Sequence, residues 1–560
     1  MIWRSGREAG TARNAAPARV WSICIVLGAL AVTPLMAQEI AGFPSWSDWP
    51  MFGQNPSNTA NNAADHAISV NTASELKTKW TFTTGGDVSA RAAVVNGVAY
   101  FPDWGGNLWA VNTATGKSIW SHQLSDYGLA AGTVSRTSPA VANGILYVGT
   151  QYVAPATLTG PQPPTGWLLA IDAAKGRLIW KMQPDTSNPF PVITGSPVVA
   201  FGLVYVPMTS NEEFAAAAGS AYKCCSVSGS VVAVDALFGF KLWETFTVPK
   251  GYSGGAVWGG NPVVDLERGT VFVGTGNNYS VPTDPAYVKC ISGGGTRATC
   301  QSPDDHADSI LALDMFTGRV RWATRLETWN QQATQGVTNG SDDWNVDCIF
   351  AAPGTANCPS APGPDYDFGS APNEITYQTQ RGPKTIIGAG QKSGIYYALD
   401  PDTGAELWQT QVGPGSSLGG IEWGSATDGT RIYVAISNLY GIPYKAGSAG
   451  SWAALDPATG AIVWQKADPN GGIDLGPMAV TNGVVYADSM GGPSSTTAKT
   501  MLALDASTGA TLWSFVAGSS VNAGAVIVDG TVYWGSGYAH LGIPGYTGNT
   551  KFYAFSINGK

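Results

Sequence analysis

Charged residues are scarce in this sequence. Asp, Glu, Lys and Arg make up 12% of the 560 residues, and the formal net charge is −9. No cluster of lysine or arginine provides the basic surface that a phosphate backbone requires, so we expect no nucleic-acid partner. So few charges also argue against a disordered chain or a coiled coil.

Long apolar runs are also rare. The single one, Ile23–Val32, follows four arginines and precedes the small residue Ala37. It is too short to span a bilayer comfortably, which predicts a secretory signal over residues 1–37 and a periplasmic or secreted protein; an uncleaved anchor is the alternative. No other segment resembles a membrane helix, so we expect no membrane span.

Cysteine is infrequent, with seven residues of which Cys24 lies in the signal. The even number that remains favours disulfides in an exported protein. Local pairing gives Cys224–Cys225, Cys290–Cys300 and Cys348–Cys358, although six cysteines allow fifteen connectivities and free thiols are an alternative. The motif Cys-x-x-Cys-His is absent, so we expect no c-type haem on this chain.

One sequence motif recurs along the chain, with a spacing close to Ala-Leu-Asp-x-x-Thr-Gly-x-x-x-Trp. Its first half runs from the alanine to the turn glycine, and its second half is the segment that ends in tryptophan. Seven copies contain both halves, and their Asn or Asp residues are Asn112, Asp172, Asp235, Asp314, Asp400, Asp456 and Asp505. An eighth copy, Tyr553–Gly559, ends before its tryptophan. Leu76–Trp80 has the tryptophan half and no preceding half.

Each copy predicts a β-hairpin, since alternating apolar residues form a strand and Asp-x-x-Thr-Gly forms a tight turn. One such sheet cannot bury its own faces, so copies must stack. The divided eighth copy predicts a closed ring in which the Trp80 strand completes the sheet of residues 552–558. We therefore expect an all-β, eight-bladed β-propeller over residues 76–560, preceded by an extension over 38–75.

Three segments lengthen the repeats: 154–165, 280–308 and 329–372. The last two each contain a cysteine pair. Long loops on a rigid scaffold often carry function, and decorated surface loops are the alternative.

The repeat resembles that of quinoprotein alcohol dehydrogenases, which use pyrroloquinoline quinone (PQQ) and usually calcium. Non-catalytic propellers share this repeat, so four local motifs carry the resemblance: Thr194–Pro197 with Tyr205–Glu212, Gly274–Asn277, Tyr366–Phe368 and Gln391–Asp400. It implies that Thr194, Thr209 and Ser210 contact the quinone and that Glu212 and Asn277 bind calcium. It further implies that Asp367 is catalytic and a calcium ligand, and that Lys392 contacts both the quinone and Asp367.

The residue types suit these roles. Calcium prefers hard oxygen ligands, which Glu212, Asn277 and Asp367 supply. A carboxylate can accept the proton of an alcohol, and Lys392 can stabilise a developing oxyanion. The alternatives are a solvated Glu212, a surface Lys392 and a turn-forming Asn277 next to the true ligand Asn278.

Five further residues are candidates for the cofactor site, and the resemblance places four of them. Trp258 and Trp423 stand where the family has tryptophans, the first of which stacks on the quinone. The Cys224–Cys225 pair resembles the family's ring over the quinone but lies in a different repeat. From its chemistry, Arg136 is a candidate to bind the carboxylates of the cofactor.

Departures from the family pattern at Ser89, Ala256 and Glu422 resemble the polyvinyl alcohol dehydrogenase branch. That branch acts on secondary alcohols, so the resemblance implies an alcohol substrate, polymeric substrates included. Electrons would pass to a separate cytochrome c or other acceptor. The competing hypotheses are a non-catalytic binding scaffold and a quinoprotein sugar dehydrogenase.

Overall fold

The computed structural model describes residues 47–152, 166–188, 190–217, 224–326, 364–492, 496–540 and 545–560. All of these residues belong to one compact unit. The expected signal, the loop 154–165 and the Cys348–Cys358 pair lie outside the described residues. Within the described ranges, the helices are all too short or too polar to cross a bilayer.

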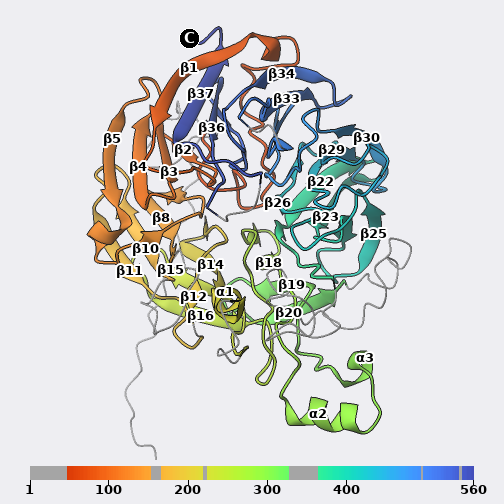
Figure 1. Cartoon of the computed structure of the whole chain (residues 1–560). Helices are drawn as coiled ribbons and strands as arrows, with labels where there is room; N and C mark the ends of the chain where they lie inside the picture. Colours follow the sequence, from red (N-terminus) through yellow and green to blue (C-terminus); the bar gives the residue numbers. More distant parts are fainter. Residues whose placement is uncertain are drawn as a thin grey trace, which may run out of the picture. The chain divides into compact units, whose positions relative to one another are not determined.

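Eight antiparallel sheets form a ring (Figure 1), which confirms the predicted eight-bladed propeller. Each blade contains four strands, named here inner, second, third and outer. Blades 1 to 4 consist of β2 (Ala93–Val95), β3 (Val98–Pro102), β4 (Asn107–Asn112) and β5 (Ser118–Gln123); β7 (Ala140–Ala142), β8 (Ile145–Gly149), β10 (Leu168–Asp172) and β11 (Leu178–Met182); β13 (Val198–Ala200), β14 (Leu203–Ser210), β15 (Ser230–Asp235) and β16 (Lys241–Phe246); and β17 (Val263–Asp265), β18 (Thr270–Gly274), β19 (Ser309–Asp314) and β20 (Val320–Arg325). Blades 5 to 8 consist of β22 (Asn373–Thr379), β23 (Gly382–Gly390), β24 (Ile395–Leu399) and β25 (Glu406–Gln411); β27 (Ala426–Thr427), β28 (Ile432–Ile436), β29 (Ser451–Leu455) and β30 (Ile462–Ala467); β31 (Ala479–Thr481), β32 (Val484–Asp488), β33 (Met501–Asp505) and β34 (Thr511–Phe515); and β35 (Val526–Val528), β36 (Thr531–Gly535), β37 (Lys551–Ile557) and β1 (Leu76–Thr83).

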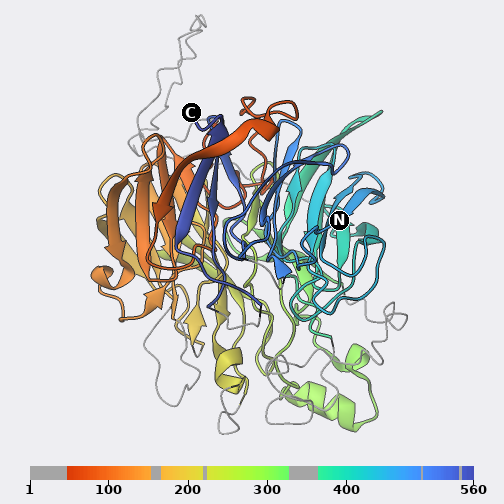
Figure 2. The ribbon, with the colours of Figure 1, turned by 45° about the horizontal axis from the view of Figure 1, so that its top comes forward.

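The remaining described elements are short. The extra strands are β6 (Thr133–Val134) paired with β9 (Gln151–Tyr152), β12 (Pro191–Val192) paired with β14, and β21 (Ser370–Ala371) parallel to β26 (Trp423–Gly424). The helices are η1 (Ala73–Glu75), η2 (Leu124–Tyr127), α1 (Glu212–Ala217), α2 (Pro285–Ser292) and α3 (Arg297–Cys300). A Cys290–Cys300 disulfide joins α2 to α3, as expected. Figure 2 shows α1 and the α2–α3 pair projecting from the same end of the ring.

The ring closes through the divided eighth copy. β1 pairs with β37 in an antiparallel ladder from Leu76 opposite Ile557 to Thr83 opposite Lys551. Trp80 lies opposite Ala554 in this ladder, so the first strand of the propeller becomes the outer strand of its last blade. The prediction made from the half copies is confirmed.

A tryptophan in every outer strand bonds to the neighbouring blade. Its indole N–H donates to a carbonyl of the next blade at 2.8–3.2 Å in all eight junctions, a turn carbonyl in seven of them and the first carbonyl of β1 in the last: Trp80 to Thr113, Trp120 to Ala173, Trp180 to Ala236, Trp243 to Met315, Trp322 to Pro401, Trp408 to Pro457, Trp464 to Ala506 and Trp513 to Leu76. The turn glycine lies against the same ring; a Cβ at Gly404, for example, would be 2.5 Å from the Trp322 indole. Thr-Gly and Trp recur in the sequence because they form one joint between blades.

The extension before β1 runs through the inside of the ring. Residues 49–62, called here the axial segment, hydrogen-bond to the inner strands of seven blades in chain order, through Val94, Val141, Val264, Glu374, Thr427, Val480 and Ile527. Met51 packs in the apolar cluster of the remaining blade, blade 3. The buried Arg91 donates to the carbonyls of Phe52, Pro477 and Met478, which fixes the segment beneath the functional site.

Deletion of residues 552–560 tests the closure. It removes the strand between β36 and β1, so it exposes the edges of both strands and leaves Trp80 without its ladder. We expect the truncated chain to aggregate, measured by light scattering and size-exclusion chromatography.

Deletion of Gly559–Lys560 alone is the control, because β37 ends at Ile557. If the longer deletion left a soluble protein with the stability and the oligomeric state of the wild type, the closing strand would not hold the ring together.

Candidate active site

The candidate residues lie at one end of the propeller, on two types of connection. Arg136, Thr194, Trp258, Asp367 and Trp423 lie between the outer strand of one blade and the inner strand of the next. Ser210, Glu212, Asn277 and Lys392 stand at or just after the end of a second strand. In an antiparallel four-stranded blade these connections share an end, so residues from several blades converge on the axis.

Asp367 is at the centre of the arrangement. Its Oδ2 accepts the indole N–H of Trp258 at 2.7 Å, and its Oδ1 accepts the backbone N–H of Asn277 at 2.9 Å. The Nζ of Lys392 lies 3.4 Å from the same Oδ2. Both side chains are buried, so the ammonium and the carboxylate stabilise each other's charged form. The resemblance predicted that Lys392 lies beside Asp367, and the structure places the two side chains at this distance.

Asp365 is a member of the site that the sequence did not reveal. Its Oδ2 lies 3.1 Å from Nζ of Lys392, closer than Asp367 does. Its backbone has a positive φ of 59°, which Asp tolerates better than most residues. Lys392 therefore bridges two buried carboxylates. In the sequence, the only sign that Asp365 belongs to the site is that it stands two residues before Asp367.

Aromatic rings and cations alternate beside this pair. Nζ of Lys392 lies 5.0 Å from the Trp258 ring, Trp258 contacts Trp423 edge to face at 5.5 Å, and the Arg136 guanidinium lies 4.5 Å from the Trp423 ring. A Cβ on Gly369 would come within 2.9 Å of Trp258, so this glycine lets the indole approach the backbone. These contacts are cation–π and edge-to-face geometries of ordinary strength.

The Cys224–Cys225 pair lies beside Trp258, although it belongs to a different repeat from the family's ring. The two cysteines form a disulfide, and they pack against the same apolar cluster as Trp258, made of Ala216, Val227, Ala256 and Tyr279. The loop after β14 thus brings the pair across to the tryptophan. The predicted pairing is present in the structure.

Glu212 is fully buried and holds the chain that follows the disulfide. Its carboxylate accepts the backbone N–H groups of Ser226 and Val227 at 2.8–3.1 Å. Val227 in turn accepts from Gly254, and Gly255 donates to the carbonyl of Asn277. Glu212 and Asn277 are therefore linked through the backbone, and Ser210 supports them because its hydroxyl accepts the N–H of Glu212 at 3.0 Å. Thr209 precedes Ser210 in β14. The side-chain amide of Asn278 donates to the backbone carbonyl of Ser253 and to the carboxylate of Asp305.

Glu422 is the second residue whose importance emerges from the structure. Its side chain is 3% exposed and its Oε1 has no hydrogen-bond partner among the described residues. Burial raises its pKa to about 7, against the lowering influence of Lys392 and Arg136 and with a smaller contribution from Asp367 that raises it. The sequence marked the position only as a departure from the family pattern.

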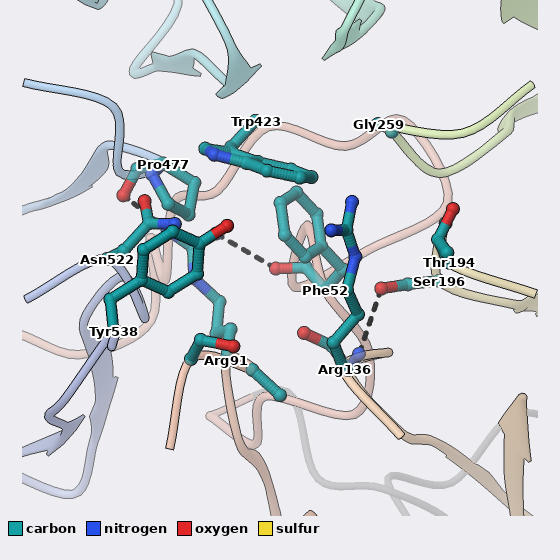
Figure 3. A pocket seen from close by; sticks show the side chains of 15 residues that line it. Phe52, Arg91, Arg136, Thr194, Ser196, Gly259, Trp423, Pro477, Asn522 and Tyr538 are labelled. Carbon is teal, nitrogen blue, oxygen red and sulfur yellow. Dashed lines mark hydrogen bonds between the residues drawn. The ribbon is translucent and has the colours of Figure 1, made fainter. Parts of the chain in front are cut away.

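Figure 3 shows the axial cavity below these residues. Arg136 and Thr194 lie on one side, Tyr538 and Asn522 on the other, with Trp423 above and Phe52 of the axial segment between them. Thr194 donates to the carbonyl of Trp258 at 2.8 Å and so supports the indole's backbone. Ser89, also on the wall, accepts the indole N–H of Trp104 at 2.8 Å.

The residues present fit a planar, anionic cofactor. Arg136 and Lys392 supply two cations, Trp258 supplies a flat apolar face, and two buried polar atoms, Glu422 Oε1 and the indole nitrogen of Trp423, have no partner among the described residues. A metal ion is a separate question. Among the described residues no three His, Cys, Asp or Glu side chains converge on one point, so a cation here requires amide, carbonyl or cofactor oxygens as well.

Comparison with known proteins supports the fold and shows the family of this chain. The family model described as outer membrane protein assembly factor BamB matches residues 67–290 and 391–551. A polyvinylalcohol dehydrogenase of Pseudomonas sp is 32% identical over 87% of this chain and 73% of the relative. A polyvinylalcohol dehydrogenase of Sphingopyxis sp. (strain 113P3) is 31% identical over 94% of this chain and 80% of the relative.

Solved structures agree on the fold. The quinohemoprotein alcohol dehydrogenase of Comamonas testosteroni superposes with a TM-score of 0.64 at 20% identity, over 92% of this chain and 81% of the other. A europium-containing methanol dehydrogenase gives a TM-score of 0.63 at 17% identity, over 92% and 98%. The class is therefore that of the quinoprotein alcohol dehydrogenase propellers. Within it, this chain belongs to the polyvinyl alcohol dehydrogenase family.

The raised pKa of Glu422 predicts a pH-dependent stability difference. Between the usual carboxyl pKa of 4.5 and the folded value of about 7, the folded protein retains a proton that the unfolded chain has lost. The folded state of the wild type therefore loses stability as the pH rises through this window.

Glu422→Gln cannot titrate. We expect the variant to gain up to about 3 kcal/mol over the wild type by pH 8 and to gain little at pH 4, measured by urea unfolding of cofactor-free protein. Other buried carboxyl groups are present in both proteins, so their contributions to the unfolding free energy cancel in the difference. A difference that stays constant from pH 4 to pH 8 would contradict the assignment.

Proposed function

We propose that this protein is an exported quinoprotein dehydrogenase that oxidises secondary alcohols, polyvinyl alcohol or a similar compound, to ketones. PQQ and calcium are the proposed cofactors, and an external acceptor such as cytochrome c receives the electrons. One observation carries the proposal: a buried carboxylate, Asp367, is held at the propeller axis by an indole N–H, a backbone N–H and the ammonium of Lys392.

Asp367 is the proposed base. The ammonium of Lys392 and two N–H donors favour its ionised form, which is the form that accepts the hydroxyl proton of an alcohol. Trp258 and Asn277 also fix its orientation, because they bind different oxygens of the carboxylate. Oδ2 accepts from both Trp258 and Lys392, whereas Oδ1 accepts one hydrogen bond and so retains a lone pair for the substrate proton or for a metal ion.

The cofactor-binding roles follow the chemistry of the side chains. PQQ, when bound, supplies a carbonyl carbon that accepts a hydride equivalent from the alcohol carbon. Trp258 and the Cys224–Cys225 pair offer apolar contacts, while Arg136, Lys392, Thr209, Ser210 and Trp423 offer hydrogen-bond donors for its oxygens. Thr194 would line the cofactor site and hold the backbone of Trp258 in place, because its hydroxyl donates to that carbonyl. Calcium would take oxygens from Glu212, Asn277 and Asp367, all hard ligands.

The substrate class, the acceptor and the location are supported by other observations. Two relatives at 31–32% identity are named polyvinylalcohol dehydrogenase, which supports a secondary alcohol. The sequence contains no Cys-x-x-Cys-His, which supports a separate electron acceptor. The expected signal over 1–37 and the Cys290–Cys300 disulfide support a periplasmic or secreted location.

Reconstitution tests this function. Metal-free, cofactor-free protein should gain activity only when PQQ and calcium are added together, and a chelator should remove the activity. The substrates tested should include polyvinyl alcohol, small secondary alcohols and sugars, each with an artificial electron acceptor. Sugars as the best substrates would indicate a sugar dehydrogenase. No turnover with any alcohol or sugar in PQQ-loaded protein would favour a binding scaffold.

Asp367→Asn tests the base. The variant keeps an oxygen ligand but lacks a basic carboxylate, so turnover should fall by roughly 10²–10⁴-fold while PQQ content stays similar. Turnover and PQQ content should be measured on one preparation.

Asp365→Asn is the matched control, because it removes an equal charge from the same ammonium. We expect it to retain turnover within roughly tenfold of the wild type, a much smaller effect than general-base loss. Equal losses in both variants, or none in Asp367→Asn, would place the base elsewhere, with Glu422 as the next candidate.

A further inference from the structure

A cluster of exposed apolar side chains lies at the end of the propeller opposite the active site. Phe201, Leu237, Phe238, Phe240 and Phe316, called here the phenylalanine patch, are 55–74% exposed. Phe201 and Leu237–Phe238 stand in the two tight turns of blade 3, and Phe316 stands in the second turn of blade 4. These turns join inner to second and third to outer strands, whereas the active-site connections lie at the other strand ends.

The patch is continuous across two blades. Phe201 contacts Phe316 edge to face with ring centroids 5.6 Å apart, and Phe238 lies 6.1 Å from Phe240. The two turns of blade 3 are joined, because the N–H of Ala236 donates to the carbonyl of Gly202. Scattered exposed apolar residues are ordinary on a protein surface, but a contiguous patch of phenylalanine indicates an interaction site.

Phe201 occupies a backbone position that disfavours it. It has a positive φ of 52° in a two-residue turn before Gly202. The four equivalent turns of other blades have Asn or Asp at this position with nearly the same φ: Asn96, Asn143, Asn482 and Asp529. Asn and Asp tolerate this conformation, whereas a bulky side chain is strained in it. Phe201 is 74% exposed, so packing within the chain does not offset that strain.

Phe238 also replaces a stabilising residue. At the equivalent turn position of blades 4, 5 and 6, a threonine hydroxyl donates to the turn aspartate, as Thr317 does to Asp314 at 2.9 Å. Phe238 cannot make this bond with Asp235. Each of the two turns of blade 3 thus has an exposed phenylalanine in place of a residue that would stabilise the turn.

Most charged side chains beside the patch are paired within the chain, and Arg319 and Glu267, which form no salt bridge with a described residue, carry opposite charges. Arg321 bonds to Asp314 at 2.7 Å, and Arg268 bonds to both Asp265 and Asp402 at 2.9 Å. The patch therefore adds little unpaired charge to a chain whose net charge is −9. Two copies repel over most of their acidic surface, and a neutral apolar patch is where they can meet.

We propose that the phenylalanine patch is a self-association surface through which two copies of this chain form a twofold dimer. A fully exposed aromatic ring presents about 150–250 Å², so the patch offers roughly 500 Å² of apolar surface. A stable interface buries about 800 Å² on each partner, which the patch and its surrounding paired charges can supply. A twofold interface uses the same patch on both subunits, as this single patch requires.

Other partners suit the patch less well. An electron acceptor or substrate bound there would be separated from the active site by the length of the blades, about 17 Å for a five-residue strand. An anionic membrane surface calls for a cluster of unpaired basic residues, whereas Arg268 and Arg321 are already paired and Arg319 is the one unpaired arginine in the described turns of blades 3 and 4.

The test is the oligomeric state of the full mature chain, measured by analytical ultracentrifugation at micromolar concentrations. The wild type should be a dimer. Phe201→Asn, Phe238→Thr and Phe316→Ala introduce residue types found at these positions in other blades, so the triple variant should fold well. Its dimer dissociation constant should rise at least roughly 100-fold, as for loss of the central residues of an interface.

Ile119→Thr with Leu407→Thr is the matched control, because both residues are exposed apolar side chains on outer strands outside the patch. The control should remain dimeric, and the triple variant should keep the thermal stability of the wild type or exceed it. A monomeric wild type would overturn the proposal, and so would a triple variant that dimerises as tightly as the wild type. Binding of monomeric wild type to lipid vesicles would instead identify a membrane contact.

Discussion

The hydrogen bond from an outer-strand indole to a backbone carbonyl of the next blade is the interaction on which the molecule depends. It occurs at all eight junctions, each with a glycine or the closing strand β1 beside it. Because each joint repeats the same geometry, the blades take equal steps around an axis and the ring closes. Without closure the connections from different blades would have no common point at which to meet.

The axis is polar at the active-site end and filled by the chain's own N-terminal residues below. Arg91 carries the positive charge nearest the axial segment, and burial lowers its pKa to about 9, although Asp488 opposes the shift. Above it, Lys392 and Arg136 face Asp365, Asp367 and Glu422. Two cations therefore face three carboxylates, and burial raises the pKa of one of them, Glu422. Charge balance in this site consequently depends on the pH and on what binds there.

The sequence predicted the parts of the structure that repeat. Regular spacing gave all eight blades, and the half copies at Trp80 and Tyr553 gave the closing strand. The resemblance in motif order indicated the contact between Asp367 and Lys392. Features without periodicity were missed, because they depend on contacts between distant residues. Asp365, the burial of Glu422 and the path of the axial segment belong to this group. The phenylalanine patch was missed for another reason: its residues stand inside recognisable repeats, where only a comparison between blades distinguishes them.

The central claim is that residues from several blades form one quinone site at the propeller axis. A crystal structure of the protein with PQQ and calcium tests it most directly. The account predicts one quinone that would be held by Trp258, Arg136 and Lys392, and a calcium ion that would be held by Glu212, Asn277 and Asp367. A quinone bound elsewhere, or absent from crystals of active protein, would contradict it.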